Sequence, residues 1–171
     1  MHEQLEIARI PPGIHFHSLQ ADHPMGIFDA LFSGLESRTK LSPQESFAGI
    51  LLAASACDGH ISDDEFQQLL AALFRMKLFQ RINEKQFNQV LNKLMGVLKK
   101  HGPDALVDGC CETLPEELRK AAFANACNIA LADGGLEDDE KQFITRLTGK
   151  LQLDAKTSQM IAKVMVIKNK G

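Results

Sequence analysis

The chain has 171 residues, a length suited to one domain with a single hydrophobic core, and 44% of its residues are hydrophobic. A formal net charge of −3 argues against a nucleic-acid-binding protein, and the absence of Trp and Tyr disfavours stacking on bases. No apolar run reaches 18 residues and the N-terminus lacks the features of a signal peptide, so we expect no direct membrane insertion and a cytoplasmic location.

Residues 1–40 differ from the rest and are expected to form an N-terminal arm and a first helix, ahead of a helical domain over residues 41–171. The arm holds four of the six histidines: His2, His15, His17 and His23. A His-rich arm can bind a transition metal, but scattered solvent-facing histidines are the simpler interpretation.

An apolar stripe follows at i, i+3, i+4 and i+7, which indicates a helix with one apolar face. It consists of Phe28, Leu31, Phe32 and Leu35. This stripe can pack on the bundle or on a second chain, so it leaves a homodimer open.

The next two helices begin at capping boxes. Ser42 and Glu45 form the first, with Pro43 at the first helical position, and Ser62 and Glu65 form the second. The first helix, predicted over 43–58, is apolar nearly all round and should lie at the centre of the fold. Gly59 is expected to end it in a left-handed conformation.

Helical periodicity continues to the end of the chain, and strand-like alternation is hard to find. The further predicted helices cover residues 62–76, 83–102, 104–112, 115–133, 137–151 and 155–168. We therefore predict an all-α, internally duplicated helical bundle of about seven to eight helices.

The cysteines lack the Cys-x-x-Cys spacing of metal sites, so we interpret them as reduced core thiols. They are Cys57, Cys110, Cys111 and Cys127. The Cys110–Cys111 pair leaves a redox or soft-metal site open, although zinc ligands are normally spaced more widely.

One acidic pattern occurs twice. Residues 56–65 read "ACDGHISDDE" and residues 131–140 read "LADGGLEDDE", in the same frame 75 residues apart. Turn chemistry and first-turn acids explain most of this charge without any ligand. They do not explain Asp58 and Asp133, which we expect in the last turns of helices, where the helix dipole disfavours a carboxylate. Two unfavourable acids at equivalent positions suggest that something positive binds nearby.

A divalent metal site is the hypothesis that follows. If the two corners face each other, four carboxylates meet: Asp58, Glu65, Asp133 and Glu140. Oxygen ligands of this kind suit Ca, Mg or Mn, and His60 would widen the choice to Zn. Asp64 and Asp139 would be outer or alternative ligands. The spacing is not that of an EF-hand, in which Gly is sixth and Glu is twelfth.

These residues resemble the tellurite-resistance TerB-like family. The similarity lies in both acidic corners and in "LPEELRKAAFANACNIALADG" at 114–134, and it covers about residues 40–155. It implies an all-α fold with a duplicated helix pair, and a divalent-metal site at the same four acids. It also implies a link to tellurite and other chemical stress, to metal sensing and to membrane-associated complexes. Glu137 stands where the first corner has Ser62, and Cys57 stands where we expect Ala.

The leading hypothesis is a cytoplasmic stress-response module that binds a divalent metal ion at the paired corners and mediates interaction with a protein partner, such as a membrane-associated stress complex. The alternative is a metal-free scaffold whose acidic face docks a basic partner. We do not expect an enzyme, because no Arg or Lys is positioned beside the acids and no nucleophile–base pair is evident.

Overall fold

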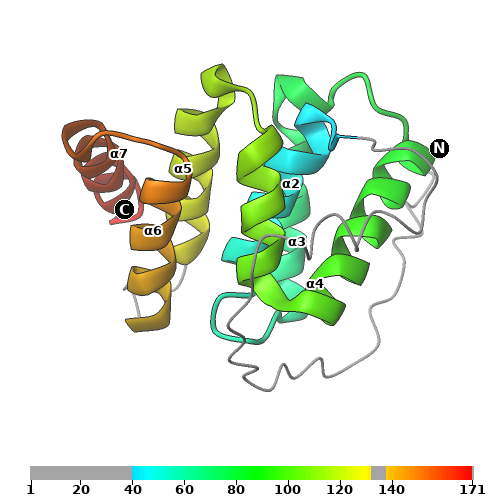
Figure 1. Cartoon of the computed structure of the whole chain (residues 1–171), viewed down its shortest axis with the longest axis horizontal. Coiled ribbons are helices and arrows are strands. Elements are labelled where there is room, and N and C mark those ends of the chain that lie inside the picture. The colour runs from blue at the N-terminus through cyan, green and yellow to red at the C-terminus, as the bar shows by residue number, and fades with distance from the viewer. Residues whose placement is uncertain (1–39, 132–137, 171) are drawn as a thin grey trace.

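The computed structural model describes residues 40–131 and 138–170, and in these ranges it contains helices and no strand (Figure 1). The elements are α2 (Pro43–Ala54), α3 (Asp63–Phe74), the 3₁₀ helix η1 (Lys77–Phe79), α4 (Glu84–Thr113), α5 (Glu116–Ala130), α6 (Asp138–Lys150) and α7 (Ala155–Lys168). The all-α prediction is confirmed. Six α-helices are described rather than seven to eight, because the helices predicted over 83–102 and 104–112 are joined in α4 and the helix predicted around residues 28–35 lies outside the described residues, as does the His-containing arm.

Helix α2 is the centre of the bundle, as its all-round apolar sequence predicts. Every residue from Ser46 to Ala54 is buried. The helix packs against both α4 and α5 (Figure 1). Close contact with α4 depends on Gly49, because a Cβ there would lie 2.4 Å from the Sγ of Cys110.

Helix α4 is two helices that meet at a kink. Gly102 has φ 79° and ψ 175°, a left-handed backbone that glycine adopts without a Cβ penalty. Pro103 follows, and because proline has no N–H it suits the first turn of the second arm. The prediction of separate helices over 83–102 and 104–112 is therefore correct, although the two run on without a loop.

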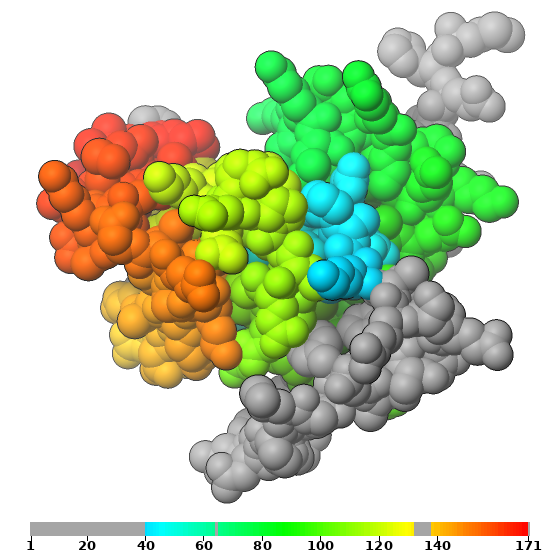
Figure 2. Space-filling view, turned by 45° about the horizontal axis from the view of Figure 1, so that its top comes forward, coloured from blue at the N-terminus to red at the C-terminus, as the bar shows by residue number. Residues whose placement is uncertain are grey.

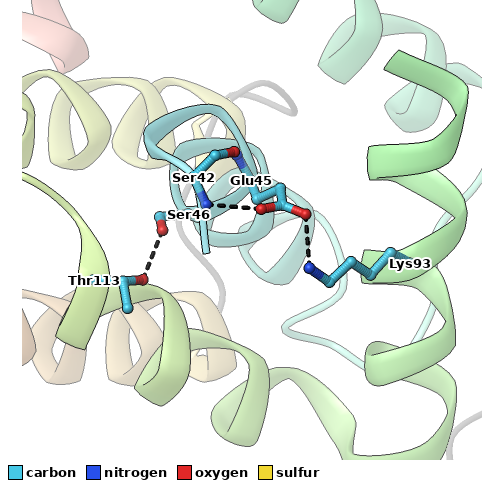
Figure 3. A network of polar contacts seen from close by, with 5 residues as sticks. All are labelled: Ser42, Glu45, Ser46, Lys93 and Thr113. Carbon is cyan, nitrogen blue, oxygen red and sulfur yellow. Dashed lines mark hydrogen bonds and ion pairs between the residues drawn. The ribbon is translucent and has the colours of Figure 1, made fainter. Parts of the chain in front are cut away.

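A polar network fastens the start of α2 to both arms of α4 (Figure 3). Glu45 accepts from the backbone N–H of Ser42 and from Lys93 Nζ, each at 2.7 Å. Ser46 and Thr113 share a hydrogen bond of 2.7 Å between their hydroxyls. Burial opposes ionisation of Glu45, but the bonds from Lys93 and Ser42 outweigh it and hold its pKa below the ordinary value. These bonds thus hold both arms of the kinked α4 against α2.

Helices α5, α6 and α7 form the other side of the molecule, and α7 lies at its edge (Figures 1 and 2). Helices α5 and α7 run parallel. Near their starts Arg119 donates to Gln152 at 2.9 Å, and near their ends Lys168 donates to Asn128 at 2.5 Å. Within the described ranges, no helix has the length and apolar character needed to cross a bilayer.

Candidate functional site

The first acidic corner begins earlier than the sequence predicts. Helix α2 ends at Ala54 and two turns follow, so Asp58 does not lie in a last helical turn, and the predicted conflict with the helix dipole is wrong at this position. Its exposed carboxylate instead accepts the backbone N–H of His60 at 2.9 Å through Oδ1. Gly59 has φ 89°, as the predicted left-handed turn requires. Local turn chemistry therefore gives Asp58 a structural role.

Glu65 completes the capping box that opens α3. Its Oε2 accepts from both the backbone N–H and the Oγ of Ser62, each at 2.7 Å, and its own N–H donates to that Oγ at 3.2 Å. The carboxylate is therefore held in place at the corner. Both bonds use Oε2, which leaves Oε1 for a further interaction.

The second corner is described only from the start of α6. Helix α5 ends at Ala130, and Asp133 lies outside the described residues, as does the side chain of Asp64 in the first corner. Asp138 is exposed and pairs with Lys141 at 3.0 Å. Asp139 is exposed and Glu140 is half-buried. Helices α3 and α6 begin 75 residues apart, at the offset of the sequence pattern.

Cys57 reports how the corners lie relative to each other. Burial raises the pKa of its thiol to about 12, and the next two contributions are the negative charges of Glu140 and Asp58. Asp139 adds a smaller one. Because the effect of a charge on a pKa weakens with distance, these contributions place the start of α6 in the neighbourhood of the turn after α2. The structure thus brings acids of both corners around one half-buried thiol.

These acids do not yet form a ligand set. Among residues 40–131 and 138–170, no three His, Cys, Asp or Glu side chains are gathered closely enough to hold a metal ion. Hard carboxylate oxygens suit a divalent cation in their chemistry. To complete a site, the segment 132–137 would have to contribute Asp133, one of the four predicted ligands.

The other three cysteines are buried, as predicted, and no described cysteine forms a disulfide. Burial raises the pKa of Cys111 and Cys127 to about 12 and that of Cys110 further still. Thiols protonated to this degree are poor nucleophiles and poor metal ligands at neutral pH.

A cleft of about 240 Å³ lies between α4 and α6, and none of the candidate acids lines it. Two ion pairs span these helices, Arg146 with Asp104 at 3.1 Å and Lys150 with Asp108 at 2.6 Å. The sequence analysis missed this feature. The matching i, i+4 spacing of the two acids and the two bases was the signal available, but nothing in the sequence says that α4 and α6 face each other.

These features define the protein as an all-α helical bundle with an acidic corner between two helices. Residues 44–163 match the family described as tellurite resistance protein TerB, so the chain belongs to the TerB family. Neither the comparison with curated proteins nor that with solved structures gave a match.

Proposed function

We propose that this TerB-family protein binds one divalent cation between its two acidic corners and that the bound ion orders a surface for a protein partner. It acts in the cytoplasm, in the response to tellurite or related chemical stress. It serves as a binding module and not as a catalyst. A membrane-associated complex supplies the partner.

The observation that carries this proposal is the electrostatic environment of Cys57. Carboxylates from both corners raise the pKa of the same thiol, so like charges from distant parts of the sequence are held near each other. Like charges held near each other repel, although water screens the repulsion where the carboxylates are exposed. A cation between the corners would turn this repulsion into attraction.

The ligands would come from both corners. Asp58 uses Oδ1 in its own turn and Glu65 uses Oε2 in its cap, so each has a second oxygen for a metal ion. Asp133 would supply a third ligand, and Glu140 would join only if the two corners moved closer together when the ion binds, because the described acids are not gathered into a ligand set. The ion would be Ca, Mg or Mn, which prefer carboxylate oxygens, or Zn if His60 joins.

The second candidate function is a metal-free scaffold whose acidic face docks a basic partner. The exposed carboxylates of Asp63, Asp138 and Asp139 favour it, because exposed charges speed and orient association without needing a bound ion. The two functions differ in whether the protein responds to a divalent cation.

Calorimetric titration of chelator-stripped protein with Ca²⁺, Mg²⁺, Mn²⁺ and Zn²⁺ tests the proposal. The variant is Asp58→Asn/Asp133→Asn. The matched control is Asp63→Asn/Asp138→Asn, which removes the same charge from the same corners at positions not proposed as ligands.

We expect one cation to bind the wild type and the control and to fail with the variant. At a hundredfold excess over Kd, the bound ion should then stabilise the fold by about 2.7 kcal/mol. If no cation binds and the Asp58→Asn/Asp133→Asn variant is more stable than the wild type, the proposal is wrong and the scaffold function is favoured.

A further inference from the structure

The outward face of α7 is apolar and uncovered by the described part of the chain. Met160, Val164 and Ile167 are 58%, 51% and 69% exposed, and their i, i+4, i+7 spacing places them in one stripe. The opposite face packs on the core through half-buried residues, among them Ile161 and Met165. Because the exposed apolar side chains are contiguous along the helix and not scattered singly, the stripe is a candidate interaction surface.

Positive charge runs beside this stripe. Lys156 and Lys163 are exposed, lie two turns apart and line the same flank of the helix. Residues 155–171 contain four lysines and no Asp or Glu, although the whole chain carries a net charge of −3. Two copies of α7 packed on each other would therefore repel. The exposed face of α7 is instead complementary to a helix that has an apolar stripe flanked by acidic residues.

The chain itself contains such a segment in residues 25–36, which read "MGIFDALFSGLE". The stripe of Phe28, Phe32 and Leu35, with Leu31 beside it, is accompanied by Asp29 and Glu36 and by no basic residue. The two acids are two turns apart on one flank, as the two lysines are on α7.

One register satisfies both patterns. If residues 25–36 lie parallel to α7 at a constant offset of 132 positions, Phe28 meets Met160, Phe32 meets Val164 and Leu35 meets Ile167. In heptad terms these residues occupy d, a and d, the lysines occupy g and the acids occupy e. Parallel helices pair g of one with the following e of the other, which joins Lys156 to Asp29 and Lys163 to Glu36.

The segment cannot reach the α7 of its own copy. Only residues 37–39 separate it from Lys40, and four residue steps span at most about 14 Å. Helix α7 is separated from α2 by α5, and two helix packings of 8–10 Å each, followed by a third onto the outer face, make roughly 25–30 Å. The register also places Glu36 beside the end of α7. Helix α2, in contrast, begins near the start of α5, as the bond between Ser46 and Thr113 shows, and α5 and α7 start at the same end.

We propose that this protein is a homodimer in which residues 25–36 of each copy pack on α7 of the other, with Lys156 paired to Asp29 and Lys163 paired to Glu36. The exchange is reciprocal, so a two-fold axis relates the copies and each contact occurs twice. The dimer does not depend on metal binding.

Sedimentation velocity of the full chain over a range of concentrations measures the assembly. The variants are Lys163→Glu, Glu36→Lys and the two combined, and Lys99→Glu, an exposed lysine of α4, is the matched control. Each single reversal should weaken the dimer roughly tenfold, because each dimer contains the pair twice and reversal replaces attraction by repulsion. The combined charge swap should restore the dimer, and the control should leave it unchanged.

Carbodiimide cross-linking of a mixture of ¹⁴N- and ¹⁵N-labelled protein identifies the partners. We expect mixed-isotope links from Lys163 to Glu36 and from Lys156 to Asp29. A wild type that stays monomeric, a dimer indifferent to Lys163→Glu, a charge swap that fails to restore it, or links confined to one isotope would each overturn the proposal. So would a protein that remains monomeric and instead sediments with anionic vesicles.

Discussion

Substitution of Gly49 by Ala tests the central packing of α2 on α4. An added Cβ would lie 2.4 Å from Cys110 Sγ, 3.2 Å from Leu94 Cδ2 and 3.4 Å from Leu106 Cδ1. All three neighbours are themselves buried, so none can move aside freely. Overpacking of this kind costs about 1–3 kcal/mol, and replacing Gly by Ala in a helix regains about 0.5–1 kcal/mol.

At the middle of each range the expected net loss is about 1.3 kcal/mol in the free energy of unfolding, measured by urea denaturation, or roughly 3–5 °C in Tm for a chain of this size. Gly96→Ala is the control, because no heavy atom lies within 4 Å of its added Cβ. That variant should be stabilised by about 0.5–1 kcal/mol through helix propensity alone.

A double-mutant cycle separates the steric cause from others. In a Cys110→Ala background the clashing sulfur is gone, so Gly49→Ala should become neutral or stabilising. If Gly49→Ala is as stable as the wild type, or if Cys110→Ala gives no relief, the close approach of α2 and α4 at this point is wrong.

Three other predictions concern charge. Asp139→Asn/Glu140→Gln should lower the pKa of Cys57 and speed its alkylation at alkaline pH, because the two negative charges help to raise that pKa. An unchanged alkylation rate would show that the two corners do not lie near each other. Burial raises the pKa of Cys57, Cys111 and Cys127 from 9.0 to about 12. The thiol contribution to the free energy of unfolding should therefore be constant below pH 9 and should fall between pH 9 and 12, where the thiols ionise readily only in the unfolded chain. Urea unfolding across this range would show no such decline if the thiols were exposed. Glu45→Gln should cost about 1 kcal/mol at neutral pH. Because the pKa of Glu45 is lowered, this difference should begin to shrink as the pH falls below 4.5 and should disappear below the lowered pKa. A difference that stays constant in urea unfolding would contradict the role of its charge.

Local signals in the sequence were enough to predict most helix starts. Ser42 and Ser62 each carry a complete capping box, and α7 begins and ends at the predicted residues. Helix ends were harder to predict. The apolar run continues to Cys57, so the sequence extends α2 to residue 58, but its backbone leaves the helix at Ala54 and closes the corner through the side chain of Asp58.

The arrangement of the candidate site depended on contacts that periodicity does not encode. The repeated pattern indicated that the corners are equivalent, but only the fold places Glu140 near Cys57. The ion pairs between α4 and α6 were missed for the same reason. A carboxylate that caps a turn and a carboxylate that binds a metal ion look alike in the sequence, because Asp serves in both roles.

The most direct test of the cation site is an NMR titration of ¹⁵N-labelled protein with substoichiometric Mn²⁺. A paramagnetic ion held between the corners should broaden the amide signals of residues 58–62 and 138–140 together, and it should leave those of α7 sharp. The Asp58→Asn/Asp133→Asn variant should abolish the broadening at both corners. Broadening at one corner alone, or weak broadening over all exposed carboxylates, would contradict a single cation shared by the two corners.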